Sequence, residues 1–493
     1  MSPRSRFRLL PALPRPPSSP FAPPSIGEPP RKHLLCRKPP QTPLLAPRPR
    51  RVTLSPCAQA NDAPYRFSGF TMRSLPYLTD KLPGIGGTIK AHIDDFVVEE
   101  VPLYPFAGVG EHAFLLIEKR GTTTHNAISI VAKAIGRRSV DFGYAGLKDA
   151  QAVTRQWISI ERETNSRFEK LELPCVKIVE QTRHRNKIKL GHLAGNRFTI
   201  KIRHEDWDKS PALAQAASAG AQAVLAALCK TGVPNFFGPQ RFGMRMDNHL
   251  LGMALLKNDP KKFMDLWLGH ADESVDRGGV LQARKHYDAG NLEAAYSAWP
   301  GHLHAERVAL GILVKNPAHH GRALNSLDIR LRRLLVSALQ AHLFNRVLEA
   351  RLPQLCHLEP GDLAWIHETG AVFEVLEDRL PLEQPRCDRH DISPSGPLFG
   401  YRMTQAAHQP GITEAQVLAG AGLSPEIFRS SAAQGSKGSR RAMRFFFQDH
   451  RIQMASDSHG GYLELVFTLP AGSFATVMLA EIMKTGTNQM LDI

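Results

Sequence analysis

Cysteine is scarce in this chain of 493 residues, and its placement excludes the sites that cysteine usually builds. The six cysteines contain no C-x-x-C pair; they are Cys36, Cys57, Cys175, Cys229, Cys356 and Cys387. This wide spacing is typical neither of zinc ligands nor of a disulfide framework, so we expect a reducing compartment. The 21 histidines contain no H-E-x-x-H pattern, and we therefore predict no metal site.

Long runs of bulky apolar residues are also missing. The longest uncharged stretch of the folded pattern, residues 211–229, is mostly alanine and is broken by glutamine and serine. Ser210 is placed as an N-cap, Pro211 as the first helical residue and Gly232 just beyond the end. These signals predict a helix of a soluble protein rather than a membrane span.

Signatures of common nucleotide and nucleic-acid modules are absent as well. Gly84, Gly86 and Gly87 resemble a phosphate loop only weakly, because neither a helix start nor G-K-[ST] follows them. No zinc finger, RNP aromatic signature or basic heptad array is present. A nuclease or other hydrolase would need metal-binding carboxylates or a Ser/His arrangement, and the sequence contains neither pattern.

Positive charge is abundant but unevenly distributed. The chain carries a net charge of +16, and residues 1–71 alone hold 12 lysines and arginines against two acidic residues, together with 17 of the 37 prolines. Such a composition cannot bury a core, so residues 1–71 are predicted to be a disordered basic extension. The extension is either an organellar transit peptide or lies upstream of the true start at Met72; we favour Met72 and a cytoplasmic protein.

The rest of the chain has strand and helix patterns in a mixed order. Residues 84–100 predict a turn and then strands, 112–118 a strand, 122–136 a helix capped by threonine, and 139–142 and 152–160 two further strands. This order predicts an α+β fold around a largely antiparallel sheet.

A second unit interrupts this pattern. Residues 245–435 are mainly helical in pattern, and a strand and a helix return at 462–469 and 473–484, after a basic loop at 437–441. We therefore predict an α+β domain formed by residues 72–233 and 436–493, with an inserted, mainly helical domain at 234–435.

One candidate for chemistry is the polar connection between the two strands predicted at 139–142 and 152–160. It contains Lys148 and Asp149 and is opened by Gly146. A carboxylate beside a lysine can act as a nucleophile or as a base. The alternative is that Asp149 is a turn former whose side chain bonds its own backbone.

Two further segments have residue types that suit RNA. In residues 183–204, Asn196, Phe198 and two isoleucines share one strand face, while Lys201, Arg203 and other polar residues share the second face. That basic face is either solvated or binds a polyanion. Residues 232–243 combine glycine and proline with three phenylalanines, which suits either base stacking or a tightly packed corner.

Taken together, these segments make the chain resemble the TruD-type tRNA pseudouridine synthases from about Gly84 onward. The resemblance rests on five blocks in one order: Asp95-Phe-Val-Val-Glu-Glu100, Gly146-Leu-Lys-Asp149 with Ala152-Val-Thr-Arg-Gln156, Gly195-Asn-Arg-Phe198, Gly232-Val-Pro-Asn-Phe-Phe-Gly-Pro-Gln-Arg-Phe-Gly243 and Leu469-Pro-Ala-Gly-Ser-Phe-Ala-Thr476. One departure is Ala150-Gln151, where family members often carry basic residues. This departure puts a local phosphate contact in doubt.

The resemblance implies an isomerase that converts uridine to pseudouridine at position 13 of tRNA without a cofactor. Asp149 would attack the substrate or act as the base that starts bond cleavage. Lys148 would orient Asp149 or neutralise charge nearby. The inserted domain would form the second wall of an RNA-binding cleft, with tRNA as the partner. Separately, we expect a monomer without a protein partner. The alternative is a non-catalytic RNA-binding protein on the same fold.

The resemblance also implies roles for four other residues. Phe96 and Phe198 would sandwich a uracil that has been flipped out of the RNA fold. Asn196 would hydrogen-bond a base or ribose edge. Arg241 and the basic strand at 193–203 would hold phosphates.

Overall fold

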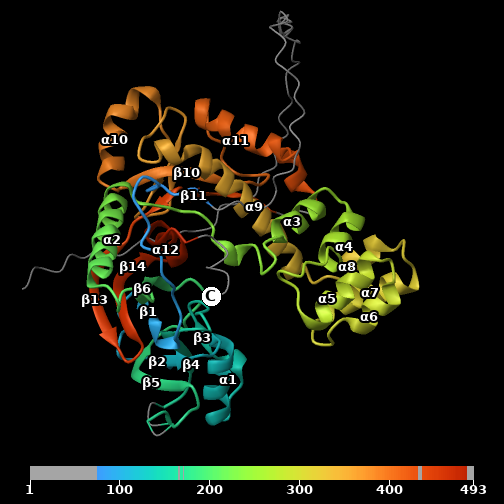
Figure 1. Cartoon of the computed structure of the whole chain (residues 1–493), viewed down its shortest axis with the longest axis horizontal. Helices are drawn as coiled ribbons and strands as arrows, with labels where there is room; N and C mark the ends of the chain where they lie inside the picture. The colour runs from blue at the N-terminus through green and yellow to red at the C-terminus, as the bar shows by residue number, and fades with distance from the viewer. Residues whose placement is uncertain (1–74, 165–166, 170, 431–435, 486–493) are drawn as a thin grey trace, which may run out of the picture. The chain divides into compact units, whose positions relative to one another are not determined.

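The computed structural model describes residues 75–164, 167–169, 171–430 and 436–485 (Figure 1). The extension predicted to be disordered, residues 1–71, lies outside the described residues, as does the alternative start at Met72.

An eight-stranded sheet forms the first part of the fold. Its strands are β1 (Phe96–Pro102), β2 (His112–Arg120), β3 (Gly143–Tyr144), β4 (Val153–Glu161), β5 (Val176–His184), β6 (Leu193–Arg203), β13 (Gln448–Asp457) and β14 (Gly460–Pro470). The order is β13-β14-β6-β1-β4-β2-β5, with β3 beside β4. Only β1 and β4 pair in parallel among these strands. The predicted α+β fold with a largely antiparallel sheet is confirmed.

Helices cover one face of this sheet in two groups. The helices are α1 (Thr124–Ala134), α2 (Pro211–Thr231) and α12 (Ala475–Met483). Apolar residues of α1 pack with β2 and β4 in one core cluster, and those of α2 and α12 pack with β6 and β14 in a larger one. Figure 1 shows α1 beside β2 and β4, and α12 beside α2. The middle of the face, over β1 and the start of β4, is therefore bordered by helices on two sides.

The ends of these helices follow the predicted signals. The Thr123 hydroxyl accepts a hydrogen bond from the Asn126 N–H at the start of α1, and Ser210 caps α2. By length and composition alone, α2 could cross a membrane. One of its faces nevertheless packs into the larger core cluster, and half of its exposed positions are alanine. One face of α2 is thus part of the core, and the helix of a soluble protein stays a prediction.

The second part of the fold begins and ends at a pair of short strands. The chain leaves the large sheet at β7 (Val233–Pro234) and returns at β12 (Arg444–Phe445), and the two strands pair antiparallel. Between them lie α3 (Asn248–Leu256), α4 (Pro260–Leu268), α5 (Gly278–Asp288), α6 (Leu292–Ala298), α7 (His304–Lys315), α8 (His320–Asn325), α9 (Ile329–Arg351), α10 (Leu380–Asp388) and α11 (His408–Gly420). The borders 234 and 435 of an inserted domain stay a prediction.

A small sheet in this part was not predicted. Its strands are β8 (Leu363–Ile366), β9 (Val372–Glu374), β10 (Ile392–Leu398) and β11 (Ser439–Ala442), in the order β11-β10-β8-β9. The basic loop predicted at 437–441 is thus wrong in part, because most of it forms β11. Arg440 in this strand is buried and pairs with Glu414 of α11 at 2.7 Å.

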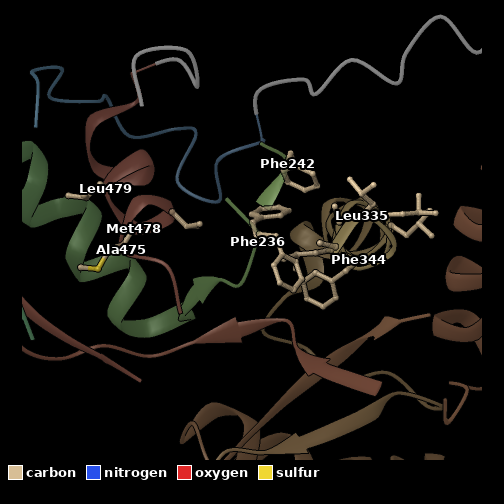
Figure 2. Close-up of a cluster of buried hydrophobic side chains, with 14 of the residues drawn as sticks. Phe236, Phe242, Leu335, Phe344, Ala475, Met478 and Leu479 are labelled. Carbon is tan, nitrogen blue, oxygen red and sulfur yellow. The ribbon is translucent and has the colours of Figure 1, made fainter. Parts of the chain in front are cut away.

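The aromatic segment 232–243 is a packed corner. Figure 2 shows Phe236 and Phe242 between α9, which carries Leu335 and Phe344, and α12. The N–H of the nearby Phe237 donates to Asn345 Oδ1 at 2.8 Å, and the Asn345 amide donates to the Phe237 carbonyl at 2.9 Å. Of the two alternatives for this segment, the structure therefore supports close packing, and the core continues from the large sheet into α9.

The strand predicted at 139–142 is wrong. Residues Ser139–Asp141 form a short 3-10 helix, and pairing with β4 begins only at Gly143. The Asp141 carboxylate accepts the Arg138 N–H at 3.2 Å, which offers the backbone a turn in place of a strand ladder.

The predicted basic face of β6 is neutralised at its end. The Arg203 guanidinium donates to both oxygens of buried Asp95, at 2.9 and 2.7 Å, and to Asp457 at 2.7 Å. Lys201 also donates to Asp457, at 2.7 Å. Hydrogen bonds from Arg203 and Lys201 hold the pKa of Asp457 well below its usual range. The expected phosphate-binding role of Lys201 and Arg203 is therefore corrected to a structural one.

We expect Arg203→Ala to destabilise the protein by about 3–5 kcal/mol, because the buried carboxylate of Asp95 would lose its partner. Urea denaturation measures this loss. Arg451→Ala is the control, since Arg451 is 63% exposed and pairs with Glu464 at the surface, where ion pairs contribute little. An Arg203→Ala protein of unchanged stability but weaker RNA affinity would restore the phosphate-binding interpretation.

Candidate active site

The loop that carries Asp149 joins β3 to β4 and is held by hydrogen bonds to Thr124 and Gln156. The Thr124 hydroxyl, at the start of α1, accepts the Lys148 N–H at 2.9 Å and donates to Gln156 of β4 at 2.8 Å. The Gln156 amide also donates to the Gly146 carbonyl at 3.3 Å. Thr124 and Gln156 are buried, so this polar link holds the loop against the sheet.

The two carboxylate oxygens of Asp149 have different partners. Oδ1 accepts the Gln151 N–H at 3.1 Å, which is the turn-forming bond that was the alternative to a catalytic role. Oδ2 contacts the ammonium group of Lys90 in an ion pair. The Asp149 side chain remains 29% exposed. Asp149 is therefore a turn residue whose carboxylate is also held by a cation and open to solvent.

Lys90 is the residue that the sequence did not reveal. It lies in the segment before β1, and 59 positions separate it from Asp149. Its backbone has φ 58°, a left-handed conformation that is uncommon outside glycine, and its side chain is 5% exposed. Its ammonium lies 4.6 Å from the ring centroid of Phe96. No motif or periodicity marks Lys90, because its contact depends on the pairing of two distant strands.

A second unpredicted lysine supports the loop through its backbone. The buried ammonium of Lys119, near the end of β2, donates to the Asp149 carbonyl at 2.5 Å and to the Thr122 carbonyl at 2.7 Å. Burial lowers the pKa of Lys119 to about 8; the positive charge of Lys148 adds to the effect, and the charge of Asp149 opposes it. Lys119 thus fixes the position of the Asp149 backbone.

The Lys148 side chain points away from the Asp149 carboxylate. Its ammonium lies 2.9 Å from Glu100 Oε2 and donates to Asn196 Oδ1 at 2.6 Å. Burial raises the pKa of Glu100, and Lys148 partly opposes this rise. Of the two roles expected of Lys148, its contacts favour neutralising a nearby charge, that of Glu100, while Lys90 contacts the Asp149 carboxylate; Lys148 also joins the Asp149 loop to Asn196 on β6.

Phe96 and Phe198 meet, but not as two walls of a slot. Their ring centroids are 6.1 Å apart with an interplanar angle of 74°, and the side chains are only 5% and 8% exposed. Phe198 also stacks on Phe467 at 5.3 Å. Because β1 and β6 pair with Val98 opposite Phe198, the two rings are diagonal neighbours on one sheet face. The two rings thus contact each other, and the ammonium of Lys90 lies over the ring of Phe96; the sandwich around a flipped uracil stays a prediction.

Arg241 lies in the packed corner rather than beside Asp149. Its guanidinium donates to Ser337 of α9 at 2.7 Å and lies 5.5 Å from the ring centroid of Phe237. Burial lowers the pKa of Arg241. The other predicted residues, Lys148, Asn196, Phe96 and Phe198, gather around Asp149, so Arg241 is the one that the structure sets apart.

We expect Phe198→Ala to lower the free energy of unfolding by about 3–5 kcal/mol, because the ring is packed against Phe96 and Phe467. Leu213→Ala, at a position 52% exposed on α2, is the control and should change stability little. Thermal and urea melting measure both variants. A Phe198→Ala protein as stable as the wild type would mean that the ring is not a core residue.

Comparison with known proteins identifies the family of the chain. A sequence profile of the family tRNA pseudouridine synthase D (TruD) matches residues 73–482. The tRNA pseudouridine synthase D of Geobacter metallireducens is 44% identical over 410 residues, which cover 83% of this chain and 98% of that protein. The protein of the same name from Thermus thermophilus is 35% identical over 418 residues, covering 84% of this chain and 94% of its own.

The fold is shared with a solved structure. The crystal structure of the TruD protein from Methanosarcina mazei superposes with a TM-score of 0.71 at 28% identity, covering 84% of this chain and 97% of that one. The profile spans most of the chain, and the relatives match over nearly their whole length. The chain therefore belongs to the tRNA pseudouridine synthase D family.

Proposed function

We propose that this protein isomerises uridine to pseudouridine in tRNA, at position 13, and that Asp149 carries out the bond-breaking step. The observation that carries the proposal is the Asp149 carboxylate, which is partly exposed yet fixed by Lys90 and by its own turn. Membership of a family whose relatives are named tRNA pseudouridine synthase D supports the reaction and the substrate class. Position 13 rests on the resemblance alone.

The reaction is an isomerisation, so its atoms balance within the substrate. The bond between N1 of uracil and C1′ of ribose breaks, the ring turns, and C5 forms a new bond to C1′. The proton that leaves C5 is balanced by one gained at N1. Asp149 either attacks the substrate as a nucleophile or acts as the base that starts cleavage.

The target base has to leave its stack before the carboxylate can reach it. In the proposed complex the uracil lies over Asp149, beside Asn196. Because Asn196 Oδ1 is occupied by Lys148, its amide NH₂ group is the part left to donate to a uracil carbonyl. Lys90 holds the carboxylate in place, and Lys119 and Thr124 hold the loop.

We expect Asp149→Asn to abolish pseudouridine formation while tRNA still binds. Asparagine retains the shape and the turn-forming acceptor, but an amide is a poor nucleophile and a poor base. Single-turnover assays with tRNA, with affinity measured on the same preparation, test this expectation. Normal pseudouridine formation by Asp149→Asn would refute the assignment. If neither the wild type nor the variant forms pseudouridine although both bind tRNA tightly, a non-catalytic RNA-binding protein would be favoured.

We expect Lys90→Met to lower the single-turnover rate by about 100-fold, since the carboxylate would lose the cation that fixes its position. The affinity for tRNA should change much less than the rate. Lys90→Arg keeps the charge and should recover part of the rate. An unchanged rate in Lys90→Met would show that the ion pair contributes nothing to the reaction.

Mapping of pseudouridine in tRNA from cells that lack the protein tests the position. The signal at position 13 should disappear, and expression of the wild-type chain should restore it. Expression of the Asp149→Asn variant should not. Loss of pseudouridine at another tRNA position, with position 13 unaffected, would correct the site while leaving the reaction in place.

A further inference from the structure

Two arginines from distant parts of the chain meet at one aromatic ring. The guanidinium carbon of Arg441, in β11, lies 4.3 Å from the ring centroid of Phe237, and that of Arg241 lies 5.5 Å from the same centroid. Arg441 also lies 5.7 Å from the ring of Phe344. Two positive charges are thus brought close together on an apolar base.

Protein groups offset these charges only in part. Arg441 donates to the Asn235 side chain and, at 3.2 Å, to the Gly472 carbonyl; Arg241 donates to Ser337. All three acceptors are neutral, and no ion pair joins either arginine to a carboxylate in the described part of the chain. The Nε atoms of both arginines are buried without a hydrogen-bond partner.

Two neighbouring arginines have structural roles, because protein groups accept their hydrogen bonds. Arg440, one residue before Arg441, forms a double hydrogen bond with the carboxylate of Glu414. Arg444, which is fully buried, donates to the carbonyls of Thr231 and Cys387 and to the Ser393 hydroxyl. Both are satisfied by the protein itself. Arg241 and Arg441 differ from them because they repel each other and lack an anion.

The pKa values of the two arginines reflect the electrostatic cost of this arrangement. Burial lowers the pKa of Arg441 to about 10, and the charge of Arg241 adds to the effect. Two like charges that are partly removed from water destabilise the fold unless an opposite charge joins them. A phosphate group is the ligand that guanidinium groups bind best, through charge-assisted and often paired hydrogen bonds.

The location connects the two arginines to the Asp149 site. Gly472, whose carbonyl binds Arg441, lies in the turn after β14. Just before that turn, Leu469 pairs with Asn196 across β14 and β6, and Asn196 binds Lys148. Arg441 therefore lies at the turn that follows the Asn196-paired end of β14, and Arg241 is tied to Arg441 through the ring of Phe237 that both arginines contact.

We propose that Arg241 and Arg441 together bind one phosphate of the RNA backbone close to the uridine that is modified. The inference rests on the proposed function, since it concerns the same RNA. A nucleotide flips by rotation about its backbone, so a phosphate held beside the site would fix the pivot of that rotation. The phosphate would also supply the negative charge that the protein does not provide.

Single and double glutamine variants of the two arginines test the proposal, with tRNA affinity measured against salt concentration. All variants carry Asp149→Asn as well, so that binding is measured without the reaction. Because one phosphate contact accounts for a slope of about 0.7–0.9 in log K against log salt, Arg241→Gln/Arg441→Gln should flatten the slope by roughly that amount. Each single variant should produce most of this change, since both arginines serve the same phosphate.

Arg389→Gln is the matched control, because it removes the same charge from an exposed site at the end of α10. It should leave the slope unchanged. Thermal melting of each variant detects a structural role: a lower melting temperature with an unchanged slope would overturn the proposal. A flattened slope together with absent pseudouridine formation by the wild-type chain would refute the proposed function and leave the phosphate site standing.

Discussion

The contact between the Lys90 ammonium and the Asp149 carboxylate depends on one feature of the sheet topology. Among the strands of the large sheet, only β1 and β4 pair in parallel, with Val97 opposite Val153. In a parallel pair, the segments that enter the two strands lie at the same end. Lys90 precedes β1 and Asp149 precedes β4, so this pairing brings them together. Strand β2 runs the opposite way beside β4 and delivers Lys119, near its own end, to the same place.

Burial of Lys119 beneath the Asp149 loop lowers the stability of the fold, and the hydrogen bonds of its ammonium partly offset this cost. Burial of Lys119 lowers its pKa from an ordinary value of 10.5 to about 8. Between about pH 8 and 10.5, Lys119 is therefore protonated in the unfolded chain and neutral in the folded one. As pH rises through this range, the free energy of unfolding increases. Below pH 8 the buried charge lowers stability. The site thus retains a destabilising charge that fixes the Asp149 backbone, as functional sites often do.

Local patterns predicted the elements around the site better than the contacts within it. The helix α1, the strand β4 and the position of Asp149 followed from periodicity, caps and a turn between strands. Lys90 was missed because its partner is set by strand pairing over 59 positions. The sequence left open whether Lys148 orients Asp149 or neutralises a nearby charge for a related reason: its carboxylate partner, the buried Glu100, lies on another strand rather than next to it in sequence.

The phenylalanines and arginines illustrate the same limit. Alternation correctly placed Phe198 on the apolar face of β6, but only the register with β1 shows that it meets Phe96 edge to face. Alternation also placed Arg203 on a basic face, yet Asp95 and Asp457, which neutralise it, come from the chain before β1 and from β13. The residue type of Arg203 therefore suggested an anionic partner, and the tertiary pairing shows that protein carboxylates take this place.

The core that runs through residues 232–243 supports the proposed phosphate site. Phe236 and Phe242 pack in the same cluster as α9 and α12, and Asn345 binds both backbone groups of Phe237 (Figure 2). Closely packed interiors transmit displacement rather than absorb it. The ring of Phe237, on which Arg241 and Arg441 rest, is therefore held by the same packing that positions α12 against the sheet. Rigid spacing between the two arginines and Asp149 is what a site needs if it is to hold a backbone phosphate while the adjoining base rotates into reach of a fixed carboxylate.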